Sequence, residues 1–200
     1  MVTDRQVQLL RLKLAEKTTI EAAAAAAGMS ARIFAYLLGT ASTCTTILRG
    51  LAQSGLTGQV FVRHSTPEQR RVVASSSIAW LEKPASIQEA LERARVAVHH
   101  GSMLLTEEAL TVGRAQVIAP IYLEHLLTAR TLVSHGLATV IRPAASSADV
   151  VSLIRQAARE GAPRALAGAA AATQVDPCAA DKLLAKLLEF AVLRQPGVNA

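Results

Sequence analysis

The feature that most constrains the fold is an alternation of short apolar runs with amphipathic segments of about ten residues, beginning near Arg32. Six apolar runs predict strands, at residues 32–38, 59–63, 78–81, 96–99, 116–119 and 138–142. Segments of helical periodicity follow them, at residues 43–54, 67–74, 86–94, 104–112, 123–134 and 147–159. Short buried strands that alternate with helices form a parallel sheet covered on both faces. The predicted fold class is therefore α/β.

Two of the predicted strands end in loops of small and polar residues. One loop is Gly39–Thr43, and the other is His99–Ser102. Ligands of parallel sheets bind at the carboxyl ends of the strands. Both loops lead directly into a helix, and a helix N-terminus attracts phosphate. Neither loop matches the Walker motif or the dinucleotide fingerprint, so the pattern indicates a phosphate site without naming its ligand.

The most specific pattern runs from the second of these loops toward Pro143. It reads Val98-His99-His100-Gly101, then Thr106, Glu108-Ala109-Leu110, Gly113, Pro120, Glu124-His125 and Thr128-Ala129-Arg130. This order and spacing resemble the signature region of nucleotide-sugar-dependent glycosyltransferases of the GT-B fold. The bacterial macrolide and rhamnosyl-type enzymes are the most similar group, and the broader resemblance covers residues 32–174. It implies a Rossmann-like parallel sheet, the C-terminal, donor-binding half of a GT-B enzyme.

The resemblance also implies two sets of site residues. The residues expected to bind the donor diphosphate are His100, Gly101, Ser102 and Thr106. Those expected to bind ribose and sugar hydroxyls are Glu108, Glu124 and His125. The donor would be a nucleotide-diphosphate sugar whose base stays open, and its departing charge would be stabilised by hydrogen bonds and helix amides. No metal and no other cofactor are expected.

Full members of this family also have an N-terminal acceptor domain, which supplies a catalytic histidine. None of the five histidines here is placed to replace that base. We therefore expect a truncated protein with no catalytic residue of its own. If it is active, it would transfer a hexosyl or deoxyhexosyl group with the help of a separate acceptor-domain partner.

Residues 1–30 form a separate predicted segment, with residues 31–200 as the main domain. A capping box at Thr18 and Glu21 and a helix stop at Gly28 predict a short helical hairpin. The opening Met-Val-Thr-Asp-Arg-Gln-Val and the later Ala-Ala-Ala-Gly-Met-Ser resemble the helix-turn-helix N-terminus of a bacterial insertion-sequence transposase. The alternative function is thus a DNA-binding transposase fragment, in which Ser30 and Arg32 would contact DNA. A third possibility is an inert product of a transposon insertion into a glycosyltransferase gene.

Composition excludes several other classes. The net charge is +6, but no run of five basic residues occurs, which indicates a solvated surface rather than a nucleic-acid stripe. The alanine-rich tract Glu21–Gly28 is too short to span a bilayer, and no signal peptide is visible. Cys44 and Cys178 lack metal-ligand spacing. A cytoplasmic protein without membrane association is expected.

Overall fold

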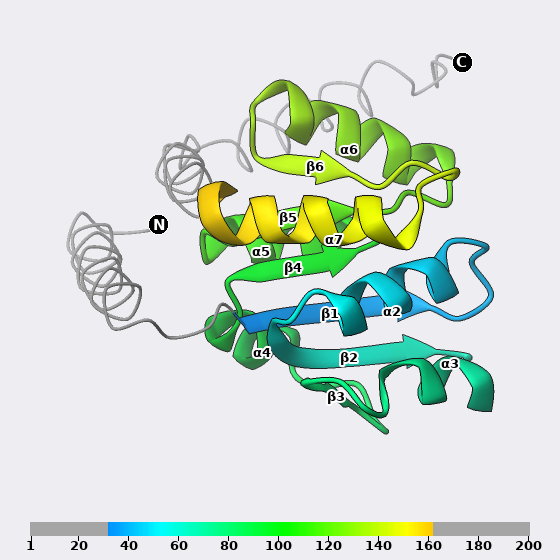
Figure 1. Ribbon diagram of the computed structural model, residues 1–200. Helices are drawn as coiled ribbons and strands as arrows, with labels where there is room; N and C mark the ends of the chain where they lie inside the picture. Colours follow the sequence, from blue (N-terminus) through cyan, green and yellow to red (C-terminus); the bar gives the residue numbers. More distant parts are fainter. Residues whose placement is uncertain (1–31, 162–200) are drawn as a thin grey trace, which may run out of the picture. The chain divides into compact units, whose positions relative to one another are not determined.

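The computed structural model describes residues 32–161, which form one six-stranded sheet (Figure 1). Every strand pair is parallel, and the strand order is β3-β2-β1-β4-β5-β6. The strands are β1 (Arg32–Leu38), β2 (Thr57–Arg63), β3 (Ile78–Trp80), β4 (Val96–His99), β5 (Ala115–Ile118) and β6 (Ala138–Val140). The predicted α/β class and the parallel sheet are confirmed.

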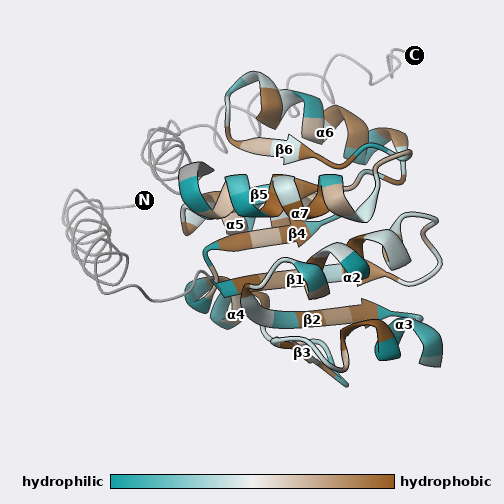
Figure 2. Ribbon diagram, in the orientation of Figure 1, coloured by the Kyte–Doolittle hydropathy of each residue, from teal (hydrophilic) through white to brown (hydrophobic). Residues whose placement is uncertain are grey.

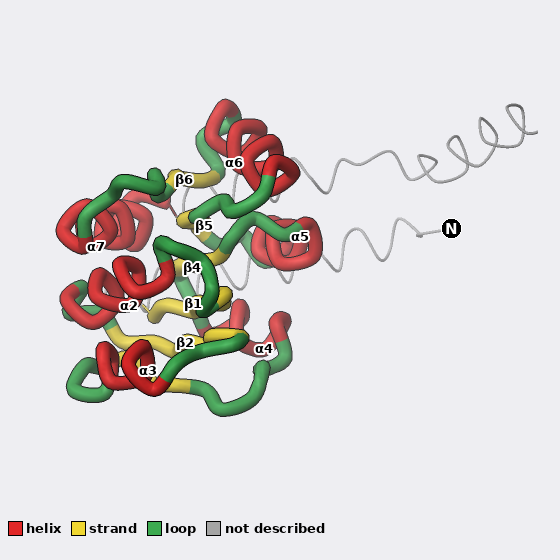
Figure 3. Tube along the Cα trace, turned by 90° about the vertical axis from the view of Figure 1, so that its right-hand side faces the viewer, coloured by secondary structure: helices red, strands yellow, loops and turns green. Residues whose placement is uncertain are grey.

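Six helices connect and cover the strands. They are α2 (Cys44–Gln53), α3 (Pro67–Val73), α4 (Ile87–Arg93), α5 (Met103–Thr111), α6 (Leu123–Ser134) and α7 (Ser147–Gln156). Viewed along the sheet, α2, α3 and α7 lie on one face, and α4, α5 and α6 lie on the other (Figure 3). The sequence placed each helix within a few residues of its bounds. The last predicted helix differs in its C-terminal part, where a π-helical turn, η1 (Ala157–Gly161), follows α7.

The side chains of the strands divide the core between the two faces. On β1, Ile33, Ala35 and Leu37 face the large cluster under α2 and α7, whereas Phe34 faces the cluster under α4 and α5. This alternation is the two-residue period of a strand. Both kinds of residue are apolar because helices cover both faces, which is why β1 is a continuous apolar run. Helix α6, beside β6, also has hydrophobic stretches (Figure 2), and they belong to a third core cluster.

The strand order defines where a ligand is expected. The chain builds β1, β2 and β3 outward in one direction and then crosses to β4, from which β5 and β6 extend the other way. β1 and β4 are therefore neighbours whose connections leave in opposite directions. Such a topological switch point opens a crevice at the carboxyl ends of the two strands. The loops Gly39–Thr43 and His99–Ser102 lie at these ends.

The remaining predictions for the fold fall on other parts of the chain. The hairpin predicted over residues 1–30 and Cys178 lie outside the described residues. Cys44 lies inside them and is buried in α2, where desolvation raises the pKa of its thiol to about 11. Within residues 32–161, no helix is long and apolar enough to cross a membrane.

Candidate functional site

The helices that begin at the ends of the central strands β1, β4 and β5 start differently from those that begin at the ends of the outer strands β2, β3 and β6. The outer helices α3, α4 and α7 have side-chain caps, from Thr66, Ser86 and Ser146. The helices α2, α5 and α6, which follow the adjacent strands β1, β4 and β5, have no side-chain cap. The first amides of a helix have no partner within it. Three sets of amides without a side-chain cap therefore begin at the carboxyl ends of three neighbouring strands.

The charges near these N-termini follow the same division. Each outer helix has a carboxylate in its first turn, at Glu68, Glu89 or Asp149. The first turns of α2 and α5 contain no acidic residue, and α6 contains Glu124. A carboxylate at a helix N-terminus already complements the helix dipole and repels a second anion. The N-termini of α2 and α5 are thus the ones open to an anion.

His100 directly follows β4, at the carboxyl ends of the three central strands. Its Nε2 accepts a hydrogen bond from the backbone N–H of Leu38 at 2.8 Å, and its Nδ1 lies 2.8 Å from the carbonyl oxygen of Ala119. The ring therefore joins the end of β1 to the end of β5. Burial lowers the pKa of His100 below its usual value. Both ring nitrogens have partners inside the protein, so in this conformation neither is offered to a diphosphate.

His99 shapes the turn that follows. Its Nδ1 accepts a hydrogen bond from the backbone N–H of Gly101 at 3.0 Å, and its Nε2 lies 2.9 Å from Oε1 of Gln116 on β5. Complete burial lowers the pKa of His99 to about 4. The amide of Gly101 is thereby occupied. The first amides available to a ligand in this loop belong to Ser102 and the opening turn of α5.

Gly101 brings this loop against helix α6. Its φ is +94°, in the region that favours glycine, and a Cβ there would lie 3.2 Å from the carbonyl oxygen of His125. The Nε2 of His125 lies 3.4 Å from a carboxylate oxygen of Glu124, and the ring contacts Tyr122 at 5.2 Å between centroids. The predicted diphosphate loop and the predicted sugar-binding pair are therefore adjacent.

The other predicted site residues sit at different depths. Ser102 is exposed at the start of α5, and Glu108 is half-buried in the middle of the same helix. Thr106 is only 4% exposed, and its hydroxyl has no hydrogen-bond partner among the described residues. The same holds for Nδ1 of His125, which is 6% exposed. Two buried polar groups, one near the start of α5 and one near the start of α6, thus lack hydrogen-bond partners among the described residues. This is uncommon in folded proteins.

Two residues that position the site were not predicted from the sequence. Gln116 holds His99 with its Oε1 and donates from its Nε2 to the carbonyl oxygen of Thr106 at 3.4 Å. Gln69 donates from its Nε2 to the carbonyl oxygen of Gly39 at 2.8 Å, and so ties α3 to the loop after β1. A signal was present for Gln116, because a polar residue inside a buried strand needs a buried partner. Gln69 lies on a short surface helix, where glutamine is ordinary.

The DNA-binding alternative receives no support from the described residues. Ser30 lies outside them, and Arg32 is the exposed first residue of β1, whose carbonyl oxygen accepts from the amide of Arg95. This alternative stays a prediction. Within the described part of the chain, no group of three His, Cys, Asp or Glu side chains is arranged to hold a metal ion.

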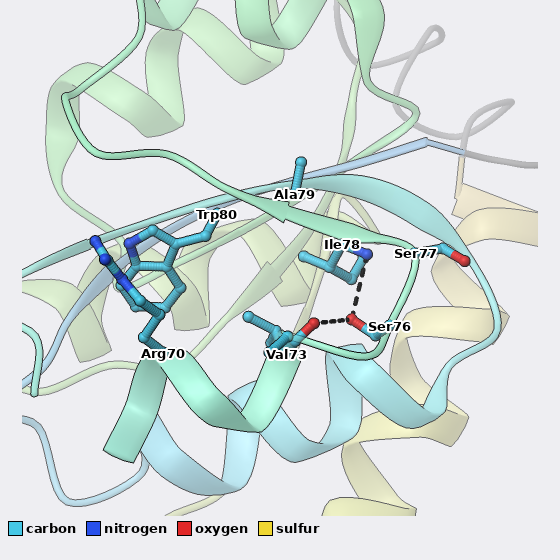
Figure 4. Close-up of a pocket in the computed structure, with 8 residues that line it drawn as sticks. Arg70, Val73, Ser76, Ser77, Ile78, Ala79 and Trp80 are labelled. Atoms are coloured by element: carbon cyan, nitrogen blue, oxygen red, sulfur yellow. Dashed lines mark hydrogen bonds between the residues drawn. The ribbon is translucent and has the colours of Figure 1, made fainter. Parts of the chain in front are cut away.

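A shallow hollow of about 510 Å³ lies away from this site, along β3 and α3 at the edge of the sheet (Figure 4). Several of its polar groups already have partners. The hydroxyl of Ser76 accepts from the amide of Ile78 and donates to the carbonyl of Val73, while Arg70 lies over the ring of Trp80 and pairs with Glu82. We therefore place the candidate site at the switch point, where the sequence motif lies.

Comparison with solved structures bears on the fold of the described domain. The chain is similar to the crystal structure of the glycosyltransferase VinC in complex with DTDP, with a TM-score of 0.58 and 18% sequence identity over 70% of this chain. The fold is one half of a GT-B fold. The GT-B half is also similar to the spinosyn forosaminyltransferase SpnP, with a TM-score of 0.56 and 25% identity over 71% of this chain. For Os79 from O. sativa in complex with UDP, the TM-score is 0.60 at 15% identity over 68% of this chain.

The similarity covers only part of those proteins. This GT-B half matches 36% of the VinC chain, 38% of SpnP and 35% of Os79. No protein-family model matches the sequence, and no curated protein matches it. The shared property is therefore the fold of one GT-B half.

Proposed function

We propose that this protein binds a nucleotide-diphosphate sugar and that the diphosphate lies at the carboxyl ends of β1, β4 and β5. The observation that carries the proposal is that α2 and α5 begin at these strands with neither a side-chain cap nor a first-turn carboxylate, while the neighbouring α6 is also uncapped but has Glu124 in its first turn. Aligned helix dipoles and free amides favour an anion at such a place without a basic side chain or a metal. The similar structures of VinC and Os79 were determined with DTDP and with UDP, which supports the same ligand class.

The roles that we propose are narrower than those predicted from the sequence. The diphosphate would be held by the hydroxyl of Ser102 and the opening amides of α5, while His100 and the amide of Gly101 support the loop from behind. Gly101 allows close approach because it has no side chain. Glu124 and His125 stand beside the loop on α6, where they would bind the donor's hydroxyl groups. Thr106 and Glu108 would act from within α5, below the opening turn.

Removing one amide tests the proposal. The first residue of α5 is Met103, and the preceding Ser102 has an extended backbone with ψ of 143°, so Met103→Pro fits the helix and deletes one N–H. We expect the affinity for UDP or dTDP to fall about tenfold, which is the contribution of one charge-assisted hydrogen bond. Calorimetric titration of the full chain with both nucleotides and their sugars measures this.

The matched control is Ser147→Pro at the first position of α7, where Ser146 is likewise extended and the helix is capped. It should leave nucleotide affinity unchanged. If both variants bind as well as the wild type, the α5 amides are not the site. If the wild type shows no binding and no thermal stabilisation at about millimolar nucleotide, the proposal as a whole is wrong.

Glycosyl transfer would require the acceptor half of the GT-B fold, and we propose that a surface beside the site contacts it. Five large apolar side chains are each more than half exposed on the opening turns of α5 and α6: Met103, Leu104, Tyr122, Leu123 and Leu127. An apolar group of this kind beside a polar site typically marks an interface. The acceptor, the sugar and the catalytic base would then come from outside residues 32–161.

A further inference from the structure

The two adjacent histidines at the end of β4, His99 and His100, are buried, and the only role assigned to them above is support of the loop. His99 is 1% exposed and His100 is 8% exposed. Buried histidines with partners on both nitrogens have a fixed protonation pattern, because a backbone N–H can only donate and a carbonyl oxygen can only accept. The partners in this structure determine that pattern for both rings.

The partners of His100 require a neutral ring with its proton on Nδ1. Nε2 accepts from the amide of Leu38, so it carries no hydrogen. Nδ1 faces the carbonyl oxygen of Ala119, so it must donate. A second proton on Nε2 would face the N–H of Leu38 directly, and one of the two bonds would be lost.

The partners of His99 require the opposite tautomer. Its Nδ1 accepts from the amide of Gly101, so that nitrogen carries no hydrogen. Its Nε2 donates to Oε1 of Gln116, whose orientation is fixed because the amide nitrogen of Gln116 donates to the carbonyl oxygen of Thr106. Two adjacent histidines therefore hold their single protons on different nitrogens.

We propose that His100 is a positioning residue, a neutral imidazole that holds the ends of β1 and β5 against β4 and so fixes the α2, α5 and α6 N-termini around the diphosphate. Its ring reaches both strands that flank β4, and each of these strands leads into an uncapped helix. Protonation of the ring breaks one side of this connection and weakens nucleotide binding. The effect on binding rests on the proposed function, whereas the tautomer and the strand connection do not.

The surroundings favour the neutral ring. Burial is the main cause that lowers the pKa of His100, and the nearby His125 on α6 adds to it, while the hydrogen bond to Ala119 opposes it. His99 on β4 and Glu124 beside His125 are the other titratable groups close to this edge, and Leu38 and Ala119 contribute only backbone atoms. The connection is therefore complete near neutral pH and is lost on acidification.

Nitrogen-15 NMR of the imidazole rings tests the tautomers directly. In the full chain at about pH 7, we expect the His100 ring to carry its proton on Nδ1 and the His99 ring to carry its proton on Nε2. The ring signals are assigned with the variants His99→Gln and His100→Gln. A protonated His100, or a His100 with its proton on Nε2, would overturn the proposal.

Amide exchange tests the connection between strands. His100→Leu removes both hydrogen bonds, so the amide of Leu38 should exchange about tenfold faster, while the amide of Gly39, which donates to Arg63, is the internal reference. His100→Gln places an acceptor near Nε2, and His100→Asn places a donor near Nδ1. The first should retain protection at Leu38 and the second should not, even if the leucine variant fails to fold. Equal protection in the two amide variants contradicts the connection.

Nucleotide titration then tests the consequence for the site. Between about pH 7 and pH 5, UDP affinity should fall more steeply for the wild type than for His100→Gln, which cannot be protonated. Equal slopes mean that the ring does not position the site. If the wild type binds no nucleotide at any pH, the proposed function fails, and the NMR and exchange measurements still decide the tautomer and the strand connection.

Discussion

The centre and the edges of the sheet differ in how the N-termini of the helices that begin there are capped. At the edges, α3, α4 and α7 begin with hydroxyl caps and first-turn carboxylates, so their amides and dipoles are satisfied locally. At the centre, α2, α5 and α6 lack these caps, although Thr43 and Ser102 stand in the cap positions of two of them. The capping residue type alone therefore does not decide the cap. Thr43 has a helical backbone that does not suit a cap, whereas Ser102 is extended like the capped Ser146 and still makes no cap bond.

The comparison extends to charge. At the edges, hydrogen bonds from its own backbone amide and from the Thr66 hydroxyl lower the pKa of Glu68, and hydrogen bonds from Ser146 lower the pKa of Asp149, so negative charge is held at those helix starts. At the centre, burial lowers the pKa of His99 and of His100, so two rings that might carry positive charge stay neutral. The N-termini of α2 and α5 thus have neither a carboxylate nor a charged histidine beside them, and Glu124 of α6 is the one first-turn carboxylate among the three central helices. A diphosphate would meet dipoles and hydroxyls rather than a countercharge.

The largest effect is expected where the central loop touches α6. Gly101→Ala adds a Cβ at a φ of +94°, 3.0 Å from Ile118 and 3.2 Å from the carbonyl of His125. Left-handed strain of about 2 kcal/mol and overpacking of about 2 kcal/mol should together lower the free energy of unfolding by about 4 kcal/mol. Urea denaturation measures it.

The control for that variant is Gly55→Ala. Gly55 has a similar φ of +70°, but the nearest atom to an added Cβ is in the Arg155 side chain at 3.6 Å. Only the strain of about 1–2 kcal/mol remains there. Equal losses at both glycines would mean that the contact between the central loop and α6 carries no energy.

The second-largest effect is the pH dependence of stability. As the pH falls, the buried histidines at the centre should lower the free energy of unfolding before the carboxylates at the edges do. The pKa of His99 is about 4 in the folded protein, below its ordinary value of 6.5, so the unfolded chain binds the proton first as the pH falls. Stability is therefore complete above about pH 6.5 and decreases toward pH 4, by about 3 kcal/mol for this ring. His100 acts in the same direction. Urea denaturation across this range measures the slope.

The variant His99→Gln should remove most of that slope, because it has no ionisable ring and its amide can still meet Gln116. The lowered pKa values of Glu68 and Asp149 have the same sign but act at lower pH, below the ordinary range of carboxylates. An unchanged slope between about pH 6.5 and pH 4 in His99→Gln would assign the acid sensitivity to groups other than this buried ring.

The sequence predicted the fold well because periodicity is a local property. The alternation of apolar strands with helices was enough to define the parallel sheet and nearly all element bounds. The predicted helix start at residue 86 coincides with the cap Ser86, and three predicted helix ends fall next to Gly55, Gly113 and Gly136, which have the positive φ that ends a helix.

The site was predicted only in outline, because its details depend on contacts between distant strands. The sequence placed His100 and Gly101 at a strand-to-helix turn, which is where they lie. It assigned them as donors to a diphosphate, whereas the ring of His100 and the amide of Gly101 have partners that come from β1, β5 and His99. No local pattern reveals that Leu38, 62 residues away, would supply one of these partners. The choice between supporting and binding roles required the strand order.

The smallest effect separates the two regions most directly. Ser146→Ala removes a side-chain cap from α7 and should lower the free energy of unfolding by about 1 kcal/mol. Ser102→Ala removes a hydroxyl that makes no cap bond in α5, so its cost should stay below about 0.5 kcal/mol.

Nucleotide binding should respond in the opposite order, with about a fivefold loss for Ser102→Ala and none for Ser146→Ala. Denaturation and calorimetry of the two variants give four values. A cap cost at Ser102 as large as that at Ser146, without any loss of binding, would mean that the centre of the sheet differs from its edges in geometry alone and holds no ligand.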